Sequence, residues 1–285
     1  MLVMIKRNLK LYFRDKTSVF FSLLSIIIVF VLYLFFLGDS MISNIKNAAG
    51  VKYLMDSWIM AGVLSITGVT TTLGVLGIMV DDNADKITKD FFTSPMKRSY
   101  LAGGYALSAV IIGIIMSIFA FAFAEAYIVL RGGQLLSVEN MLKVFGIIPL
   151  SVISSSAMMF FLVSFFQSRR AFSTASIIVG TSIGFLTGIY IPIGDLNSTI
   201  QFLIKIFPVS YAGSLFRSVM MEQAISNTFA SAPSETIDTF KYHMGVLYQM
   251  NGQTINAELC IMLLTITVIV FFGLVVFRLS KKKMN

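Results

Sequence analysis

Six long and almost uncharged stretches dominate the pattern of polar and apolar positions along the chain. A helix needs about 20 apolar residues to cross a bilayer, and each stretch has roughly that length or more. Strands of a membrane barrel would instead alternate apolar and polar residues over about 10 positions. The pattern therefore predicts an all-α polytopic membrane protein with six transmembrane helices, at residues 17–38, 57–80, 101–130, 144–168, 171–192 and 259–278.

Residues 2–16 are predicted to form an N-terminal interfacial helix. At helical spacing, one face carries the apolar residues Leu2, Ile5, Leu9 and Tyr12, and another carries the basic residues Lys6, Arg7, Lys10 and Arg14. A basic amphipathic helix of this kind lies in the plane of the lipid headgroups. Anchoring to membrane lipid is its expected role, and direct contact with a partner is the alternative.

The segment 195–258 precedes the last predicted span. Its first parts, Leu196–Phe207 and Val209–Met221, are mostly apolar but too short to span, and Pro208 separates them. Two such half-helices can enter the outer leaflet and return when protein covers them. We therefore expect outer re-entrant half-helices here, followed by a polar loop or small cap over residues 222–256.

Composition argues against an ordinary soluble domain, a disordered chain, a collagen-like fibre and a disulfide scaffold. Hydrophobic residues make up 56% of the chain, charged residues 13%, and the mean hydropathy is +0.85. An ordinary soluble domain carries about 25% charged residues. With one cysteine and one histidine, the sequence predicts no internal disulfide and no metal site of conventional ligands.

The basic residues predict the orientation of the spans, because cytoplasmic loops carry an excess of Lys and Arg. An even number of spans places both termini on one side. Most of the 22 Lys and Arg residues lie on that side: Lys6, Arg7, Lys10, Arg14, Lys16, Lys86, Lys89, Lys97, Arg98, Arg169, Arg170, Arg278 and Lys281–Lys283. We expect a plasma-membrane protein with cytoplasmic N- and C-termini. The net charge of +8 is assigned to topology and anionic lipid rather than to nucleic acid.

Motifs for nucleotide binding or catalysis give little support for an enzyme. No GxxxxGK[ST] sequence occurs, so no Walker phosphate loop is expected. The sequence from Gly180 to Gly184 fits GxSxG, which would make Ser182 the nucleophile of an intramembrane protease. Its only possible histidine base, His243, lies in a polar outer segment. Close helix packing through Gly180, Gly184 and Gly188 is the favoured interpretation, and no catalytic residue is predicted.

Several residues inside the predicted spans are candidates for a transport pathway or a gate. A run of hydroxyls between glycines suits either a mildly polar pathway or close packing, and both interpretations stay open. An ionisable group in a membrane helix is costly and often functional, although Glu125 lies near Arg131 and could pair there or reach the interface. The candidates are Thr70, Thr71, Thr72, Glu125, Gly184 and Gly188.

The loop 81–98 between the second and third spans is predicted to contain a short amphipathic helix. Asp81 or Asp82 can cap its start, and Pro95 ends it. The adjacent Phe91 and Phe92 form an apolar patch without a soluble domain to cover it, and exposed apolar patches usually mark an interface. This loop is therefore a candidate docking site for a partner.

Four segments in order resemble the permease of ABC-2 type exporters. They are the basic start Lys6–Asp15, the loop Asp81–Tyr105 with its FFTSPMKR sequence, the stretch Gly184–Pro192, and the pair Ile206–Tyr211 and Leu215–Arg217. The resemblance covers nearly the whole chain. It implies a single transmembrane domain over residues 1–285 whose first segment is a connecting helix and whose loop forms a cytoplasmic coupling helix, expected over Asp82–Ser94.

The resemblance also implies partners and a function. Two permease chains, identical or different, would assemble with separate ABC ATPase subunits that hold ATP and Mg²⁺, and would export an amphipathic drug, toxin, peptide or lipid-like molecule. No cofactor is expected in this chain. The implied coupling interface comprises Asp82, Asp85, Lys86, Lys89, Asp90, Phe91, Phe92 and Pro95. An ATP-independent secondary transporter is the main alternative.

Overall fold

The structure, a computed structural model, describes residues 1–17, 19–20, 27–29, 31, 33, 50–88, 98–250 and 252–281. The predicted first span, 17–38, falls largely outside these residues. In chain order the elements are α1 Leu2–Arg14, α4 Val51–Ala84, α6 Arg98–Leu130, α7 Val138–Val163, α8 Arg169–Leu186, the 3₁₀ helix η2 Ile193–Asp195, α9 Ser198–Ile206, α10 Pro208–Met220, α11 Glu222–Thr228, α12 Ser234–His243, β1 Tyr248–Met250, β2 Gln253–Ile255 and α13 Ala257–Lys281.

The described residues form a mostly helical membrane protein. Four helices among them are long and apolar enough to cross a bilayer, namely α4, α6, α7 and α13. The pair α9 and α10 is bent by 90° at its junction and would make a fifth span if the two were counted as one. The polytopic all-α class is thus established, while the count of six spans stays a prediction.

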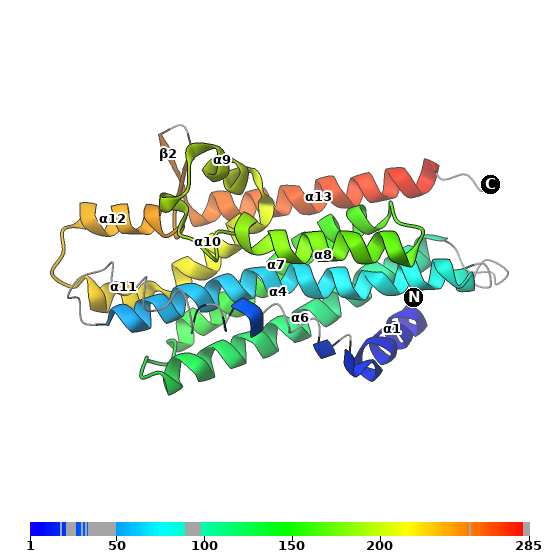
Figure 1. The fold of residues 1–285 in the computed structure, drawn as a ribbon, viewed down its shortest axis with the longest axis horizontal. Coiled ribbons are helices and arrows are strands. Elements are labelled where there is room, and N and C mark those ends of the chain that lie inside the picture. The colour runs from blue at the N-terminus through cyan, green and yellow to red at the C-terminus, as the bar shows by residue number, and fades with distance from the viewer. Residues whose placement is uncertain are drawn as a thin grey trace.

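Helix α4 lies at the centre of the bundle and is buried along most of its length (Figure 1). It packs against α6, α7, α8 and α10. Small residues allow this close packing, because a Cβ added to Gly113 of α6 would lie 2.6 Å from Cγ1 of Val152 and 3.1 Å from Cγ2 of Thr72. Three helices therefore meet at Gly113 with no room for a side chain.

The helix predicted to start at Asp81 or Asp82 does not start there. Helix α4 continues through both residues to Ala84, and the chain turns at Lys86, which has a φ of 62°. The carboxylates of both aspartates pair with arginines from other helices. These pairs offset the unfavourable position of acidic residues at a helix C-terminus, so the helix extends beyond the predicted 57–80.

Helix α8 is shorter than the predicted fifth span, 171–192. It begins after Ser168, whose side chain accepts a hydrogen bond from the Ala171 amide, and it ends at Leu186. Gly188 follows with a φ of 61°, a conformation that favours glycine. The chain therefore turns before Pro192 instead of continuing as one helix.

The segment before the last span has the break expected at Pro208. The side chain of Asn197 accepts a hydrogen bond from the Ile200 amide and caps α9, while Pro208 occupies the first turn of α10. Proline suits that position because its missing N–H would be unpaired there anyway. Helices α11 and α12 follow, and then a two-stranded antiparallel sheet in which Tyr248 faces Ile255. No alternating pattern predicted these three-residue strands.

The face of helix α1 that is buried against the protein differs from its apolar face, whose contact with lipid stays a prediction. Met4, Asn8 and Tyr12 are buried, whereas Leu2 is 82% exposed. Asn8 faces inward because its side-chain amide donates to the hydroxyl of Ser108 on α6, at 3.1 Å. This polar contact fits the rotation of a helix that also buries Met4 and Tyr12 and pairs Arg7 with Asp82.

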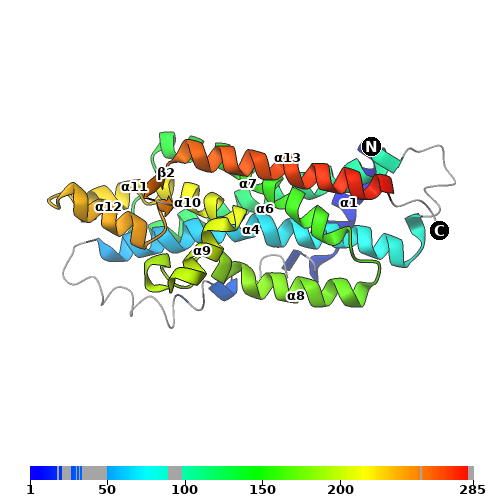
Figure 2. The ribbon, with the colours of Figure 1, turned by 90° about the horizontal axis from the view of Figure 1, so that it is seen from above.

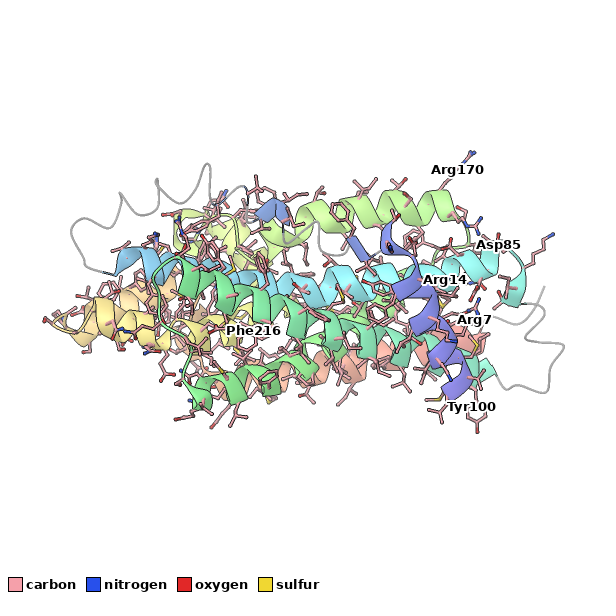
Figure 3. All side chains as sticks on the ribbon, turned by 90° about the horizontal axis from the view of Figure 1, so that it is seen from below. Arg7, Arg14, Asp85, Tyr100, Arg170 and Phe216 are labelled. Carbon is pink, nitrogen blue, oxygen red and sulfur yellow. The ribbon has the colours of Figure 1, made fainter. Side chains whose placement is uncertain are left out.

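The basic segments gather at one end of the bundle, here called the basic end. It comprises α1, the C-terminal turn of α4, the N-terminal turn of α8 and the C-terminal turn of α13 (Figure 1). Figure 3 shows Arg7, Arg14, Asp85 and Arg170 together at this end. The opposite end, here called the loop end, carries α11, α12 and the β-hairpin. The basic residues thus lie at one end, as the distribution of Lys and Arg along the sequence predicted. The assignment of this end to the cytoplasm stays a prediction.

Candidate functional site

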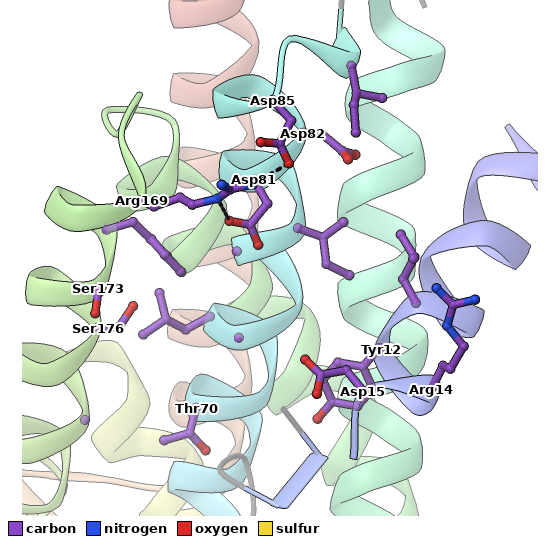
Figure 4. A pocket seen from close by; sticks show the side chains of 18 of the residues that line it. Tyr12, Arg14, Asp15, Thr70, Asp81, Asp82, Asp85, Arg169, Ser173 and Ser176 are labelled. Carbon is purple, nitrogen blue, oxygen red and sulfur yellow. Dashed lines mark hydrogen bonds and ion pairs between the residues drawn. The ribbon is translucent and has the colours of Figure 1, made fainter. Parts of the chain in front are cut away.

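A cavity of about 1160 Å³ lies between α1, α4 and α8 at the basic end (Figure 4). Its lining combines three kinds of residue. The charged ones are Arg7, Arg14, Asp15, Asp81, Asp82, Asp85 and Arg169, the hydroxyl-bearing ones are Tyr12, Thr70, Ser173 and Ser176, and the apolar or small ones are Leu11, Leu73, Gly74, Gly77, Ile78, Ile87, Phe172, Ile177 and Gly180.

The lining changes in character along α4 and α8. Asp85 and Arg169 lie at the basic end of these helices (Figure 4), whereas Thr70 and Gly180 lie farther from that end along the sequence of α4 and α8. Walls of mixed polarity favour ligands that are themselves amphipathic. The volume falls slightly above the range of about 300–1,000 Å³ that is usual for small-molecule pockets.

Glycine brings α8 close to α4 beside the cavity. The ring of Phe172 packs against Gly77, where an added Cβ would lie 2.8 Å from Cε1 of the ring. Phe172 also packs edge-on against Phe166, with ring centroids 6.2 Å apart. A side chain at position 77 would displace this ring, so the glycine sets the width of the cavity at this level.

A hydrogen-bonded network joins α1 to α4 and α6 on one side of the cavity. The guanidinium of Arg7 donates to both carboxylate oxygens of Asp82, each at 2.7 Å. The hydroxyl of Tyr105 donates to the same carboxylate at 2.5 Å. The hydrogen bonds to Asp82 raise the pKa of Arg7 above its ordinary value. Because the Asp82 side chain is only 4% exposed, these partners compensate for its burial.

A second ion pair joins α8 to α4 on the other side of the cavity. Nε of Arg169 donates to Asp81 at 2.8 Å, and its NH2 group donates to Asp85. The hydrogen bond to Asp81 is the largest cause of the raised pKa of Arg169. All three side chains are about half exposed, so water screens these pairs more than the pair of Arg7 with Asp82.

The predicted coupling residues fall into two groups. Asp82 is buried inside the chain, and Asp85 and Lys86 are exposed at the end of α4. The others, Lys89, Asp90, Phe91, Phe92 and Pro95, lie outside the described residues. The structure therefore places the start of the coupling segment next to the cavity and leaves its docking role as a prediction.

The three threonines of the predicted pathway differ in position. Thr70 lines the cavity, and its hydroxyl donates to the carbonyl of Ile66 at 3.2 Å. Thr72 donates to the carbonyl of Gly68 at 2.7 Å and is buried. Thr71 is buried too, and its hydroxyl has no hydrogen-bond partner among the described residues. Only Thr70 is thus placed to contact a molecule in the cavity.

Glu125, Gly184 and Gly188 are not among the residues that line this cavity. Glu125 is 7% exposed in α6, near the loop end, and accepts a hydrogen bond from the Leu136 amide at 3.0 Å. The ring of Tyr190 covers Gly184, and Gly188 forms the turn after α8. Their possible roles are therefore separate from this cavity.

Two charged residues near the loop end are buried, although neither was among the predicted site residues and only Arg217 belonged to a noted motif. Asp56 of α4 is 2% exposed, and its carboxylate lies 3.7 Å from Nε of Arg131 and 3.3 Å from the hydroxyl of Tyr127. Arg217 of α10 is 1% exposed. Asp56 directly precedes the predicted span 57–80. A charge at that position is normally expected to face water, so its burial was not predicted.

No arrangement for metal binding or proteolysis is evident in the described part of the chain. It contains no group of three His, Cys, Asp or Glu side chains that could hold a metal ion. His243 pairs with Asp195, its Nε2 lying 3.3 Å from the carboxylate. Ser182 belongs to α8, and its neighbour Gly184 packs against Tyr190. These contacts favour the packing interpretation of the GxSxG sequence.

Comparison with known proteins adds one match. The family described as ABC-2 type transporter matches residues 1–221, which include α1, the cavity, and helices α4 to α10. A search of the curated proteins found no match.

Proposed function

The chain belongs to the ABC-2 type transporter family, and we propose that it is the permease of an ATP-driven exporter for an amphipathic substrate. Members of this family are transmembrane permeases that associate in general with an ABC ATPase. The proposal specifies direction, energy source and substrate class. The substrate is a drug, toxin, peptide or lipid-like molecule that enters from the cytoplasm or the inner leaflet.

The cavity between α1, α4 and α8 is the observation that supports this proposal most. Its charged residues lie at the basic end, and its apolar and small residues extend toward the middle of the bundle. An amphipathic molecule would place its polar group among the former and its apolar part along the latter. The positive-inside rule assigns the basic end to the cytoplasm, which is the side from which an exporter takes its substrate.

The basic end is also where the ABC ATPase would attach. Helix α4 ends at Ala84, and the segment 89–97 follows after only a few residues. Its last turn is tied to α1 through Arg7 and to α8 through Arg169. Movement imposed on the segment 89–97 by an ATPase would therefore act on both walls of the cavity. ATP and Mg²⁺ would be held by that partner, and this chain would perform no chemistry.

Co-purification with the ATPase tests the coupling role of the loop. The double variant Phe91→Asp/Phe92→Asp is expected to retain about one tenth or less of the bound ATPase, because charged side chains would have to be desolvated in an apolar contact. The matched control is Leu135→Asp/Val138→Asp, an exposed apolar pair at the loop end. Equal ATPase recovery with both variants would contradict the coupling role.

Transport by the purified chain tests the energy source. In proteoliposomes, uptake of amphipathic dyes into inside-out vesicles should require both the ATPase and ATP. Transport by the permease alone, driven by an ion gradient, would instead establish the secondary transporter. A second permease chain, identical or different, is part of the proposal, and crosslinking of the assembled complex would reveal it.

A further inference from the structure

Helix α8 forms one wall of the cavity, and among the described helices and strands it packs mainly against α4 and α9. Figure 2 shows it along the edge of the bundle beside α4. Ile177 and Ile178 on it are 64% and 59% exposed. The contacts that hold its two ends to the rest of the protein differ in kind.

At the basic end, ion pairs that are exposed to water join α8 to α4. Arg169 pairs with Asp81 and Asp85, and the exposed fractions of the three side chains are 54%, 56% and 48%. Exposed ion pairs contribute little to stability, because water competes for both charges. Beside this pair, the half-buried ring of Phe172 packs closely on Gly77 and edge-on against Phe166, so it is the main apolar contact at this end. Separation of this end of α8 from α4 would thus break exposed ion pairs and one apolar contact, without leaving a charge buried and unpaired.

At the loop end, buried hydrogen bonds join the C-terminal end of α8 to α10. NH2 of Arg217, which is 1% exposed, donates to the carbonyls of Gly188 at 2.8 Å and Thr187 at 3.2 Å. The hydroxyl of Ser210 donates to the carbonyl of Leu186 at 2.8 Å. The guanidinium also lies over the ring of Trp58 of α4, 5.0 Å from its centroid. Separation here is costly, because it would leave the carbonyls of Leu186, Thr187 and Gly188 without these donors. Among the described residues, the buried charge of Arg217 would keep one backbone acceptor, the carbonyl of Gly245.

We propose that α8 is a hinged wall of the cavity, with Arg169 as the gate residue and Arg217 as the fixed pivot. Release of Arg169 from Asp81 and Asp85 lets the basic end of α8 move away from α4 and admits the substrate. The loop end of the helix stays in place. The inference rests on the proposed function, since it describes how access to the cavity of the permease is controlled.

The reactivity of one cavity residue tests the gate in the full chain. Oγ of Ser176 lines the cavity wall yet is shielded from water and unpaired among the described residues. In a Cys260→Ala background, Ser176→Cys should react slowly with a charged methanethiosulfonate. Adding Arg169→Gln should accelerate that reaction about tenfold, as expected for local opening. The control Thr187→Cys, buried at the other end of α8, should keep its slow rate.

Exchanging the charges of Arg169 and Asp81 distinguishes an effect of this ion pair from a general loosening of the protein. Arg169→Asp alone should give fast modification of Ser176→Cys, and Arg169→Asp combined with Asp81→Arg should restore the slow rate. A rate that stays within about twofold of the parent in Arg169→Gln would overturn the proposal. Equal acceleration at Thr187→Cys would also overturn it, because the whole helix would then have loosened.

Distances between spin labels test the pivot. Labels at Ala84→Cys and Arg170→Cys span the basic ends of α4 and α8, and labels at Lys52→Cys and Thr181→Cys report on the other half of α8. Arg169→Gln should lengthen or broaden only the first distance distribution, and a change in the second would refute a fixed pivot. Both measurements use the permease without an ATPase. A failed transport assay would therefore refute the proposed function and leave the gate standing, and a failed gate assay would do the reverse.

Discussion

Removing the guanidinium of Arg7 should detach α1 from the bundle. In Arg7→Ala, the carboxylate of Asp82 loses the two hydrogen bonds of 2.7 Å and keeps the one from Tyr105. Asp82 is 4% exposed and Arg7 28% exposed at the side chain. The Asp82 carboxylate is thus left nearly dry with one neutral donor, while the rest of the bundle keeps its contacts.

The expected cost follows from these exposures. Breaking a fully buried ion pair by removing one partner costs about 3–5 kcal/mol. Since Arg7 is partly in water and Tyr105 remains, we expect about 2–3 kcal/mol of α1 docking energy to be lost. This loss corresponds to roughly 30- to 150-fold faster local opening.

Hydrogen exchange of the permease in lipid nanodiscs measures this opening directly. The amides of residues 2–14 should exchange faster in Arg7→Ala by that factor, while those of α7 keep their protection. Lys10→Ala, an exposed position on the same helix, is the matched control for lost charge. In an Asp82→Ala background, Arg7→Ala should add little further, because the pair acts as a unit. The reasoning is refuted if Arg7→Ala and Lys10→Ala exchange alike, or if the two single effects simply add.

Two further predictions concern packing. Gly113→Ala places a Cβ 2.6 Å from Cγ1 of Val152 and should destabilise the solubilised protein by about 1–3 kcal/mol through overpacking. Thermal denaturation should show this loss of stability, and adding Val152→Ala should relieve it. The control Gly146→Ala should lose no stability, because open space surrounds Gly146. Ser182→Ala should leave transport unchanged, since the serine is assigned to helix packing, and abolished activity in that variant would restore the protease interpretation.

Some properties of this protein can be predicted from short stretches of sequence. The long apolar runs predicted membrane helices, and the clustering of Lys and Arg predicted that the chain ends and the 81–98 loop share one end. Pro208 predicted the break between α9 and α10, because proline restricts the residues beside it whatever the tertiary contacts are. Each of these inferences depends on an interaction within a few residues or with the bilayer.

Other properties depend on residues that are distant in sequence. Acidic residues after an apolar run normally indicate the end of a span in water, yet Asp81 and Asp82 belong to α4 because Arg169 and Arg7 pair with them. Periodicity grouped Leu2 with Ile5, Leu9 and Tyr12 as the apolar face of α1, and it gave no sign that Asn8 would be buried against Ser108 of α6. No local pattern could have identified these partners.

The candidate site shows the same division. The sequence by itself determined the class of protein and which end is basic, because hydrophobic burial and loop charge act locally and additively. Only the tertiary structure decided that α1, α4 and α8 enclose a cavity, and that Arg217 is buried at the far end of α8. Ion pairs and helix contacts join whichever side chains the packing brings within a few ångströms, and that proximity is a property of the whole fold.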